Sequence, residues 1–136
     1  MYIDANVIIY AALDNTELGE KARELMRKFG SKEIQAAISA LVVDEVLWGV
    51  QKIRGREAAA DFGKIMLSMP FSWLDAGYTS VRHALEFHKQ GLDPRDAFHA
   101  GIMKDYNLHD ILSEDTHFDK VKGVRRKSIK DAIDGK

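Results

Sequence analysis

The chain has 136 residues, 46% of them hydrophobic, which is long enough for one layered core and too short for two domains. It has no cysteine, which excludes disulfides, thiolate nucleophiles and zinc–sulfur sites and leaves oxygen and imidazole groups as the strong metal ligands. The formal net charge is −1, so any binding of nucleic acid must come from local basic patches rather than from the overall field.

Turn residues and hydrophobic spacing predict alternating strands and helices. Gly30 and Gly55 follow helical stretches and are expected to end them, and Pro94 suits the first turn of a helix because its missing N–H is not needed there. The expected elements, in chain order, are a strand over Tyr2 to Asp4, helices over Asn6 to Leu13 and Glu17 to Phe29, a strand over Ile34 to Ile38, helices over Leu41 to Ile53 and Arg56 to Met69, a strand over Phe71 to Leu74, helices over Thr79 to Gln90 and Pro94 to about Tyr106, and strands over Asp110 to Ser113 and Val124 to Lys127. Such alternation implies an α/β fold with a parallel sheet covered on both faces.

The chain shows no sign of a membrane segment or a secretory signal. No apolar stretch approaches the ~18 to 20 residues that span a bilayer. The first apolar run lacks a basic lead-in and contains Asp4, unlike a signal peptide. We therefore expect a cytoplasmic protein without a membrane partner, a single domain over residues 1–136 with a loosely ordered tail from about 128 to 136.

Four carboxylates lie far apart in the chain, each within or next to a segment that is otherwise expected to be buried: Asp4, Glu45, Asp96 and Asp115. In open α/β sheets the functional crevice forms beyond the carboxyl ends of the strands. Two of these acids lie at or just past the ends of predicted strands, and two lie early on helices that begin at the same edge. If the fold brings the four acids together at this edge, their charges repel one another until a cation binds. A hard divalent ion such as Mg²⁺ or Mn²⁺ is the cation that prefers such oxygen ligands.

Taken singly, these acids also have structural interpretations. Asp4 and Asp115 are suited to cap a helix or turn, and Asp96 suits the positive end of its helix. Asp44 stands beside Glu45, and periodicity does not decide which of the two faces inward. Asp93 and Asp119 are further candidates on the same edge.

Four short motifs in this order resemble a PIN domain, and nearly the whole chain takes part. They are Tyr2-Ile3-Asp4-Ala5-Asn6-Val7, Ile38-Ser39-Ala40 leading to Glu45, Pro94-Arg95-Asp96-Ala97-Phe98-His99-Ala100, and Ser113-Glu114-Asp115 followed by Phe118-Asp119. In order and spacing the chain is similar to the small prokaryotic PIN proteins, most of which are VapC-type toxins of toxin–antitoxin pairs. The resemblance implies a three-layer α/β/α fold with a central parallel sheet of four to five strands.

The resemblance also implies a function and a site. It implies a ribonuclease that uses Mg²⁺ or Mn²⁺, acts on RNA, forms a homodimer and pairs with an antitoxin protein. The family's acids fall on Asp4, Glu45, Asp96 and Asp115, with Asp119 as an accessory metal ligand, and so the helical acid is Glu45 rather than Asp44. Asn6 stands where the family often has Thr or Ser, and its amide is a substitute ligand or hydrogen-bond partner. Ser113 fits the hydroxyl-bearing position before the fourth acid.

Other side chains carry secondary hypotheses. The stretch from Lys120 to Lys130 is basic and contains no acid, so Arg125, Arg126 and Lys127 are candidate RNA contacts, although a solvated surface explains the same charges. His99 lies one helical turn beyond Asp96, where it is either a proton relay or a structural histidine. Four aromatic residues are candidates for base stacking or for the core: Trp48, Trp73, Phe98 and Phe118.

Three other classes of protein are alternatives to a PIN-type ribonuclease. Phosphohydrolases of the haloacid dehalogenase type need a second Asp two residues after the first, where this chain has Asn6. A receiver-like phospho-switch needs a strand-end Lys that is missing here. The stronger rival is a catalytically silent PIN fold that binds RNA or serves in assembly, but such a module would gain nothing from the repulsion among an intact set of acids.

Overall fold

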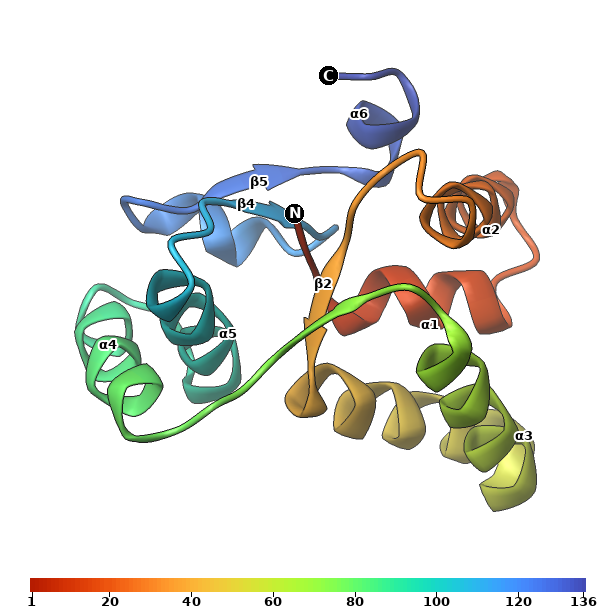
Figure 1. Ribbon diagram of the computed structural model, residues 1–136, viewed down its shortest axis with the longest axis horizontal. Coiled ribbons are helices and arrows are strands. Elements are labelled where there is room, and N and C mark those ends of the chain that lie inside the picture. Colours follow the sequence, from red (N-terminus) through yellow and green to blue (C-terminus); the bar gives the residue numbers. More distant parts are fainter.

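The computed structural model describes residues 1–136, and its centre is one five-stranded sheet with helices on both faces (Figure 1). The strands are β1 (Tyr2–Ile3), β2 (Ala37–Ser39), β3 (Ser72–Leu74), β4 (Asp110–Leu112) and β5 (Arg125–Lys127). Their order across the sheet is β3-β2-β1-β4-β5, and every pairing is parallel. This confirms the predicted three-layer α/β/α fold, with five strands in the sheet.

The helices form the two outer layers. They are α1 (Ala5–Leu13), α2 (Glu17–Gly30), α3 (Ala40–Ser68), α4 (Tyr78–Lys89), α5 (Pro94–Asp105), the 3₁₀ helix η1 (Thr116–Lys120) and α6 (Ile129–Ile133). In Figure 1, α4 and α5 lie together on one side of the sheet, and α1, α2 and α3 lie on the other. None of these helices combines the length and the apolar character needed to cross a membrane.

The central strand β1 fixes where the core sits. Tyr2 pairs with Ala37 on one side and with Ile111 on the other, so the first residues of the chain lie between segments that are far away in sequence. Tyr2 and Ile3 are both fully buried, because helices cover the two faces toward which their side chains point. A short strand therefore suffices here, since its neighbours and both helical layers hold it.

Gly55 divides the long helix α3 into two helical segments. Its backbone has φ 86° and ψ 175°, a conformation that glycine adopts without the steric cost that other residues pay. The predicted helices on either side of Gly55 are thus confirmed. Met66 in the second segment is fully buried, so the chain after the break still contributes to the core.

Three local features differ from the sequence-based expectation. The second strand begins at Ala37 rather than Ile34, because the Ile34 N–H bonds back to the Lys28 carbonyl and completes the end of α2. Residues 116–120 form η1, which was not predicted. The segment expected to be a loose tail instead contains α6, where Ser128 and Asp131 form a capping box and Ile129 is fully buried.

Candidate functional site

The parallel sheet brings the four predicted acids to one edge. Asp4 directly follows β1, and Asp115 lies three residues beyond β4, the neighbour of β1. Glu45 lies in the second turn of α3, which starts where β2 ends, and Asp96 lies in the first turn of α5. Because these strands run in the same direction, their carboxyl ends meet, and the helices that begin there contribute their first turns.

Asp4 is a buried carboxylate at the centre of this edge, only 5% exposed. It is the N-cap residue of α1, but its side chain makes no capping hydrogen bond. Instead Oδ2 accepts hydrogen bonds from Ser113 Oγ at 2.6 Å and from Asn6 Nδ2 at 3.1 Å, which leaves Oδ1 without a side-chain partner. Burial raises the pKa of Asp4 above its ordinary value, and Glu45 adds to this. The capping interpretation therefore does not account for this side chain.

Ser113 ties the first acid to the fourth. Its hydroxyl is fully buried, donates to Asp4, and accepts hydrogen bonds from Asn6 Nδ2 at 3.1 Å and from the Asp115 backbone N–H at 2.9 Å. The accessory positions Asn6 and Ser113 thus lie within the same hydrogen-bonded group as Asp4. The amide of Asn6 acts here as a hydrogen-bond partner of the carboxylate.

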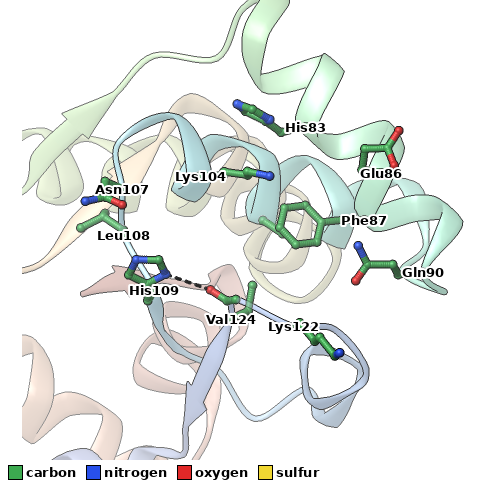
Figure 2. Close-up of a pocket in the computed structure, with 12 residues that line it drawn as sticks. His83, Glu86, Phe87, Gln90, Lys104, Asn107, Leu108, His109, Lys122 and Val124 are labelled. Atoms are coloured by element: carbon green, nitrogen blue, oxygen red, sulfur yellow. Dashed lines mark hydrogen bonds between the residues drawn. The ribbon is translucent and has the colours of Figure 1, made fainter.

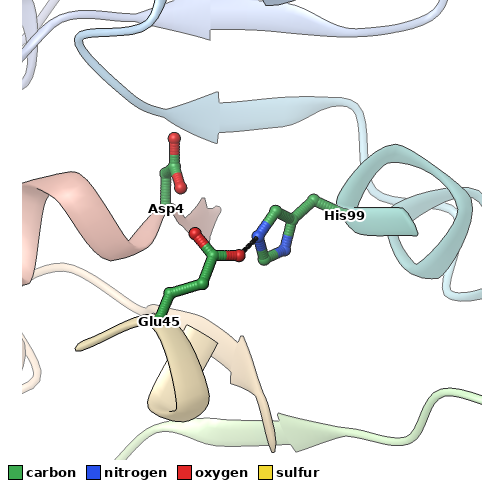
Figure 3. Close-up of side chains that lie close together, drawn as sticks. All are labelled: Asp4, Glu45 and His99. Carbon is green, nitrogen blue, oxygen red and sulfur yellow. Dashed lines mark hydrogen bonds and ion pairs between the residues drawn. The ribbon is translucent and has the colours of Figure 1, made fainter. Parts of the chain in front are cut away.

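Glu45 belongs to a second hydrogen-bonded chain, which reaches into the core. His99 is fully buried, and its Nε2 lies 2.5 Å from Glu45 Oε1 (Figure 3). Its Nδ1 lies 2.7 Å from the Tyr2 hydroxyl, which lies 2.7 Å from Ser39 Oγ. The Glu45 carboxylate can only accept, so Nε2–H donates to it, and Nδ1 of the neutral ring then accepts from the Tyr2 hydroxyl, whose pKa burial raises. The buried histidine therefore orients Glu45.

The structure also separates the two neighbouring acids on α3. Glu45 faces Asp4 and His99, and its side chain is 17% exposed, whereas Asp44 is exposed to solvent. Arg95 is the one arginine near Glu45, with its Nε 4.0 Å from Oε1, and it is itself largely exposed. Helical periodicity left this choice open, and the packing of α3 against the sheet puts Glu45 on the inner side.

Asp96 and Asp115 form the second half of the site, together with His117. The ligating atoms of these three side chains lie within 4.8 Å of one another, as do those of Asp4, Glu45 and His99. Burial, followed by the charges of Asp115, Asp4 and Glu45, raises the pKa of Asp96 to about 6. The four predicted acids are therefore close enough to repel one another.

The donor set fits a hard divalent cation. Carboxylate oxygens from four side chains converge, and Asp4 Oδ1 has no side-chain hydrogen bond. The pKa of Asp96 is raised above that of an ordinary Asp. Mg²⁺ and Mn²⁺ prefer such oxygen ligands, and a bound cation would remove the repulsion that raises these pKa values. Asp4, Glu45, Asp96 and Asp115 are thus the side chains suited to hold a metal ion.

Asp119 and the basic stretch lie beside this cluster rather than in it. Both carboxylate oxygens of Asp119 accept hydrogen bonds from the Arg126 guanidinium at 3.1 Å, and the same guanidinium donates to the Ser113 carbonyl. Arg125 pairs with Asp110 at 2.7 Å. Acids from other parts of the fold therefore neutralise two of the three cations expected to contact RNA, and Lys127 is the one that makes no ion pair.

Two site residues have roles that the sequence pattern did not show. His117 was not singled out, although its place two residues after Asp115, before a buried Phe118, was a usable signal. For Tyr2 the sequence indicates only a strand position. The contact between its hydroxyl and His99 appears only in the folded structure. Of the candidate stacking residues, Phe118 belongs to the core, whereas three are partly exposed: Trp48, Trp73 and Phe98.

A separate cavity of about 350 Å³ lies at the opposite edge of the sheet (Figure 2). It is lined partly by His109 and Val124, which precede β4 and β5, and by Phe87 and Lys104 from α4 and α5. None of the four clustered acids lines it. The acid cluster and this cavity are therefore separate features of the protein.

Fold and site together define an α/β protein whose parallel sheet carries a cluster of carboxylates at its carboxyl edge. The sequence matches the PIN domain over residues 1–124, and the chain belongs to this family. A search of curated protein sequences finds no match.

Solved structures that share this fold include a VapC toxin and VapBC complexes. The chain superposes on VapC20 of Mycobacterium tuberculosis, a toxin that cleaves the sarcin-ricin loop, with a TM-score of 0.69 and 16% identity, covering 85% of this chain and 89% of that one. DNA-bound VapBC from Salmonella typhimurium gives 0.71 and 20%, covering 94% and 96%. PAE2754 from Pyrobaculum aerophilum gives 0.61 and 22%, covering 98% and 93%. At these identities the likeness establishes a shared fold.

Proposed function

We propose that this protein is a divalent-metal-dependent endoribonuclease and the toxin of a VapBC-type pair. The observation that carries the proposal is the convergence of Asp4, Glu45, Asp96 and Asp115, two of which have raised pKa values. Holding ionised carboxylates this close costs free energy that a protein needing only its shape would not retain. Family membership and the VapC-like fold support the same activity.

Mg²⁺ or Mn²⁺ bound by these acids would neutralise phosphate oxygens and activate water. Asp4 is central because Ser113 and Asn6 fix its Oδ2 while its Oδ1 has no side-chain hydrogen bond, so Asp4 would hold the metal ion. Glu45 keeps Oε2 free while His99 holds Oε1, so it can orient the attacking water. By the family resemblance, the products carry 5′-phosphate and 3′-hydroxyl ends.

The substrate is RNA, and the cations beside the acid cluster would bind its phosphates. Lys127 makes no ion pair. Arg125 and Arg126 pair with Asp110 and Asp119, and an RNA phosphate group can take the place of either carboxylate. These contacts position the chain rather than select the bond to be cut. Trp48, Trp73 and Phe98 have exposed ring area for stacking on bases.

An antitoxin protein is the expected regulatory partner. Several neighbours of the same fold are VapBC complexes, including those from Rickettsia felis and Salmonella typhimurium. The open acidic edge suits a basic segment of an antitoxin, which would cover the carboxylates and displace the cation. A small reading frame directly upstream whose product binds this chain with a measurable loss of cleavage supports the pairing, and a product that binds without inhibition contradicts it.

We also propose a homodimer. Helix α4 leaves Tyr78, Val81 and Leu85 exposed, and their spacing of three and four residues places them on one face of the helix. Burial of such a stripe against a second copy would remove apolar area from water. Light scattering during size-exclusion chromatography should give twice the chain mass for the parent and the monomer mass after Leu85→Glu. A monomeric parent contradicts this arrangement.

The function is tested with purified protein and a mixed-structure RNA, in Mg²⁺ or Mn²⁺ and again with chelator. We expect internal cleavage that stops with chelator and in the variant Asp4→Asn. Cleavage that persists with chelator contradicts the metal dependence. RNA binding without cleavage by the folded, metal-loaded parent would support the rival reading, a catalytically silent RNA-binding module.

A further inference from the structure

His117 lies beside Asp96 and Asp115, and its imidazole offers a nitrogen ligand where the acids offer oxygen. Its Nδ1 is 3.0 Å from Asp115 Oδ1 and 3.8 Å from Asp96 Oδ2, so one ring nitrogen faces two carboxylates from different elements. Ligands that share one cation lie about 3 to 4 Å apart when each is about 2.1 Å from the ion. Both distances from the His117 ring meet this requirement, and the three side chains offer ligand atoms that all lie within 4.8 Å of one another.

Packing does not account for the position of this ring. The His117 side chain is 54% exposed, so it buries little apolar area against its neighbours. What holds it is the backbone: Asp115 caps η1 and accepts a hydrogen bond from the His117 N–H at 2.8 Å, which presents the ring to the carboxylates. The local turn therefore fixes the ring beside the acids without burying it.

The other histidine of the cluster is differently placed. His99 is fully buried, and both of its ring nitrogens already have partners, Tyr2 at 2.7 Å and Glu45 at 2.5 Å. Its Nε2–H donates to the carboxylate, so it has no lone pair directed at a cation. Of the two histidines near the acids, only His117 has a ring nitrogen that can face a bound ion and remain open to solvent.

We propose that His117 supplies one nitrogen ligand, with Asp96 and Asp115, to a first-row transition ion, and that this ligand makes the site select Mn²⁺ over Mg²⁺. The inference rests on the proposed metal-dependent function and concerns which ion that function uses. Mg²⁺ keeps to hard oxygen ligands and retains its waters, whereas imidazole is a ligand of first-row transition ions. Nitrogen ligation therefore adds affinity for Mn²⁺ that Mg²⁺ does not gain.

The direct test is pulsed electron paramagnetic resonance of Mn²⁺ bound to the full chain, which detects coupling to a ligating nitrogen. We expect nitrogen coupling in the parent, its loss in His117→Ala, and its retention in His109→Ala. His109 is a matched control, because it is another partly exposed histidine, bonded to Gly123 far from the acids. Exposure of His117 makes its substitution compatible with folding, which circular dichroism checks.

The outcomes separate this inference from the proposed function. Calorimetry should show an about tenfold weaker affinity of His117→Ala for Mn²⁺ with an about unchanged affinity for Mg²⁺. Bound Mn²⁺ without nitrogen coupling in the parent overturns the inference and leaves a metal-dependent nuclease with an all-oxygen site. Coupling that survives in His117→Ala and disappears in His99→Gln assigns the nitrogen to His99 and also overturns it. A folded parent that binds neither ion overturns both the inference and the proposed function.

Discussion

His99 Nε2 lies 2.5 Å from Glu45 Oε1, and this contact joins the buried core to the acid cluster. The ring cannot turn away from the carboxylate, because the Tyr2 hydroxyl holds Nδ1 at 2.7 Å and the whole side chain is buried. A neighbour that fixes a ligating group contributes to metal affinity without touching the metal. His99 is thus a positioning residue.

Replacement of His99 should therefore weaken the metal site in a way that an amide partly restores. We expect His99→Leu to lower Mn²⁺ affinity and cleavage by about 10- to 100-fold. His99→Gln should recover part of the loss, because its amide N–H can donate to Glu45. Calorimetry and single-turnover cleavage measure both effects. Equal losses in the two folded variants would indicate that only the core packing of His99 matters.

Glu45→Gln should reduce the proposed RNA cleavage far more than Asp44→Asn. Both changes are nearly isosteric, but Glu45 faces Asp4 while Asp44 is exposed to solvent. We expect cleavage to fall by at least about 100-fold in the first variant and by less than about threefold in the second. The matched pair controls for the helix they share. Similar losses with intact folding would mean that Asp44 also contacts substrate or metal.

Asp96→Asn should stabilise the metal-free protein at neutral pH. Asp96 has a folded-state pKa of about 6 against an ordinary 3.8, so the fold prefers its protonated form. Its contribution to stability is fully present below about pH 4 and is lost as pH rises through about 6. After allowance for solvent screening, the gain from the amide is on the order of 1 kcal/mol at pH 7.

Chemical denaturation with chelator, repeated between about pH 4 and 7.5, checks this sign. The parent should lose stability over that range more steeply than the variant, and excess Mn²⁺ should stabilise the parent more than the variant by mass action. A variant that is less stable than the parent at neutral pH without metal would show that Asp96 serves as a helix-terminus anchor.

Neutralising the basic strand should weaken RNA binding and flatten its salt dependence. The triple change Arg125→Gln, Arg126→Gln and Lys127→Gln removes three cations from β5, although Arg126 also releases Asp119. Each lost phosphate contact lowers the slope of log affinity against log salt by about 0.7 for a single strand. The control removes three cations from α3: Arg54→Gln, Arg56→Gln and Lys64→Gln. An equal slope change in the control would assign the effect to net charge alone.

Gly101→Ala should destabilise the fold, whereas Gly63→Ala should not. A Cβ at Gly101 would lie 2.3 Å from the Ser80 carbonyl oxygen, where α5 crosses α4 closely. At Gly63 the nearest atom is a flexible Leu47 methyl carbon at 3.4 Å. We expect a loss of about 1 to 3 kcal/mol at the first position and a gain of up to about 1 kcal/mol at the second. Thermal melts compare them, and equal stability would mean that α4 moves aside at little cost.

Local sequence patterns were enough to predict the order of the main strands and helices and the place of Asp4 at the end of the first strand. Strand–helix alternation, the Gly55 break and the placing of Asp4 after the first strand are local properties, set by side-chain spacing and backbone preference. They sufficed for the parallel sheet, because short strands joined by helices have few other ways to bury both faces.

Which charged side chains lie close together depends on how the elements pack in space. The pairing of Asp119 with Arg126, and of Arg125 with Asp110, depends on β5 lying beside β4 and η1, which no local pattern encodes. The hydrogen bonds from Ser39 through Tyr2 and His99 to Glu45 join four separate elements. The sequence therefore indicates only a local role for each of these side chains, such as a helix cap at Ser39 or a strand position at Tyr2. The energy of two charges depends on their separation in space, and for residues far apart in sequence only the folded structure sets that separation.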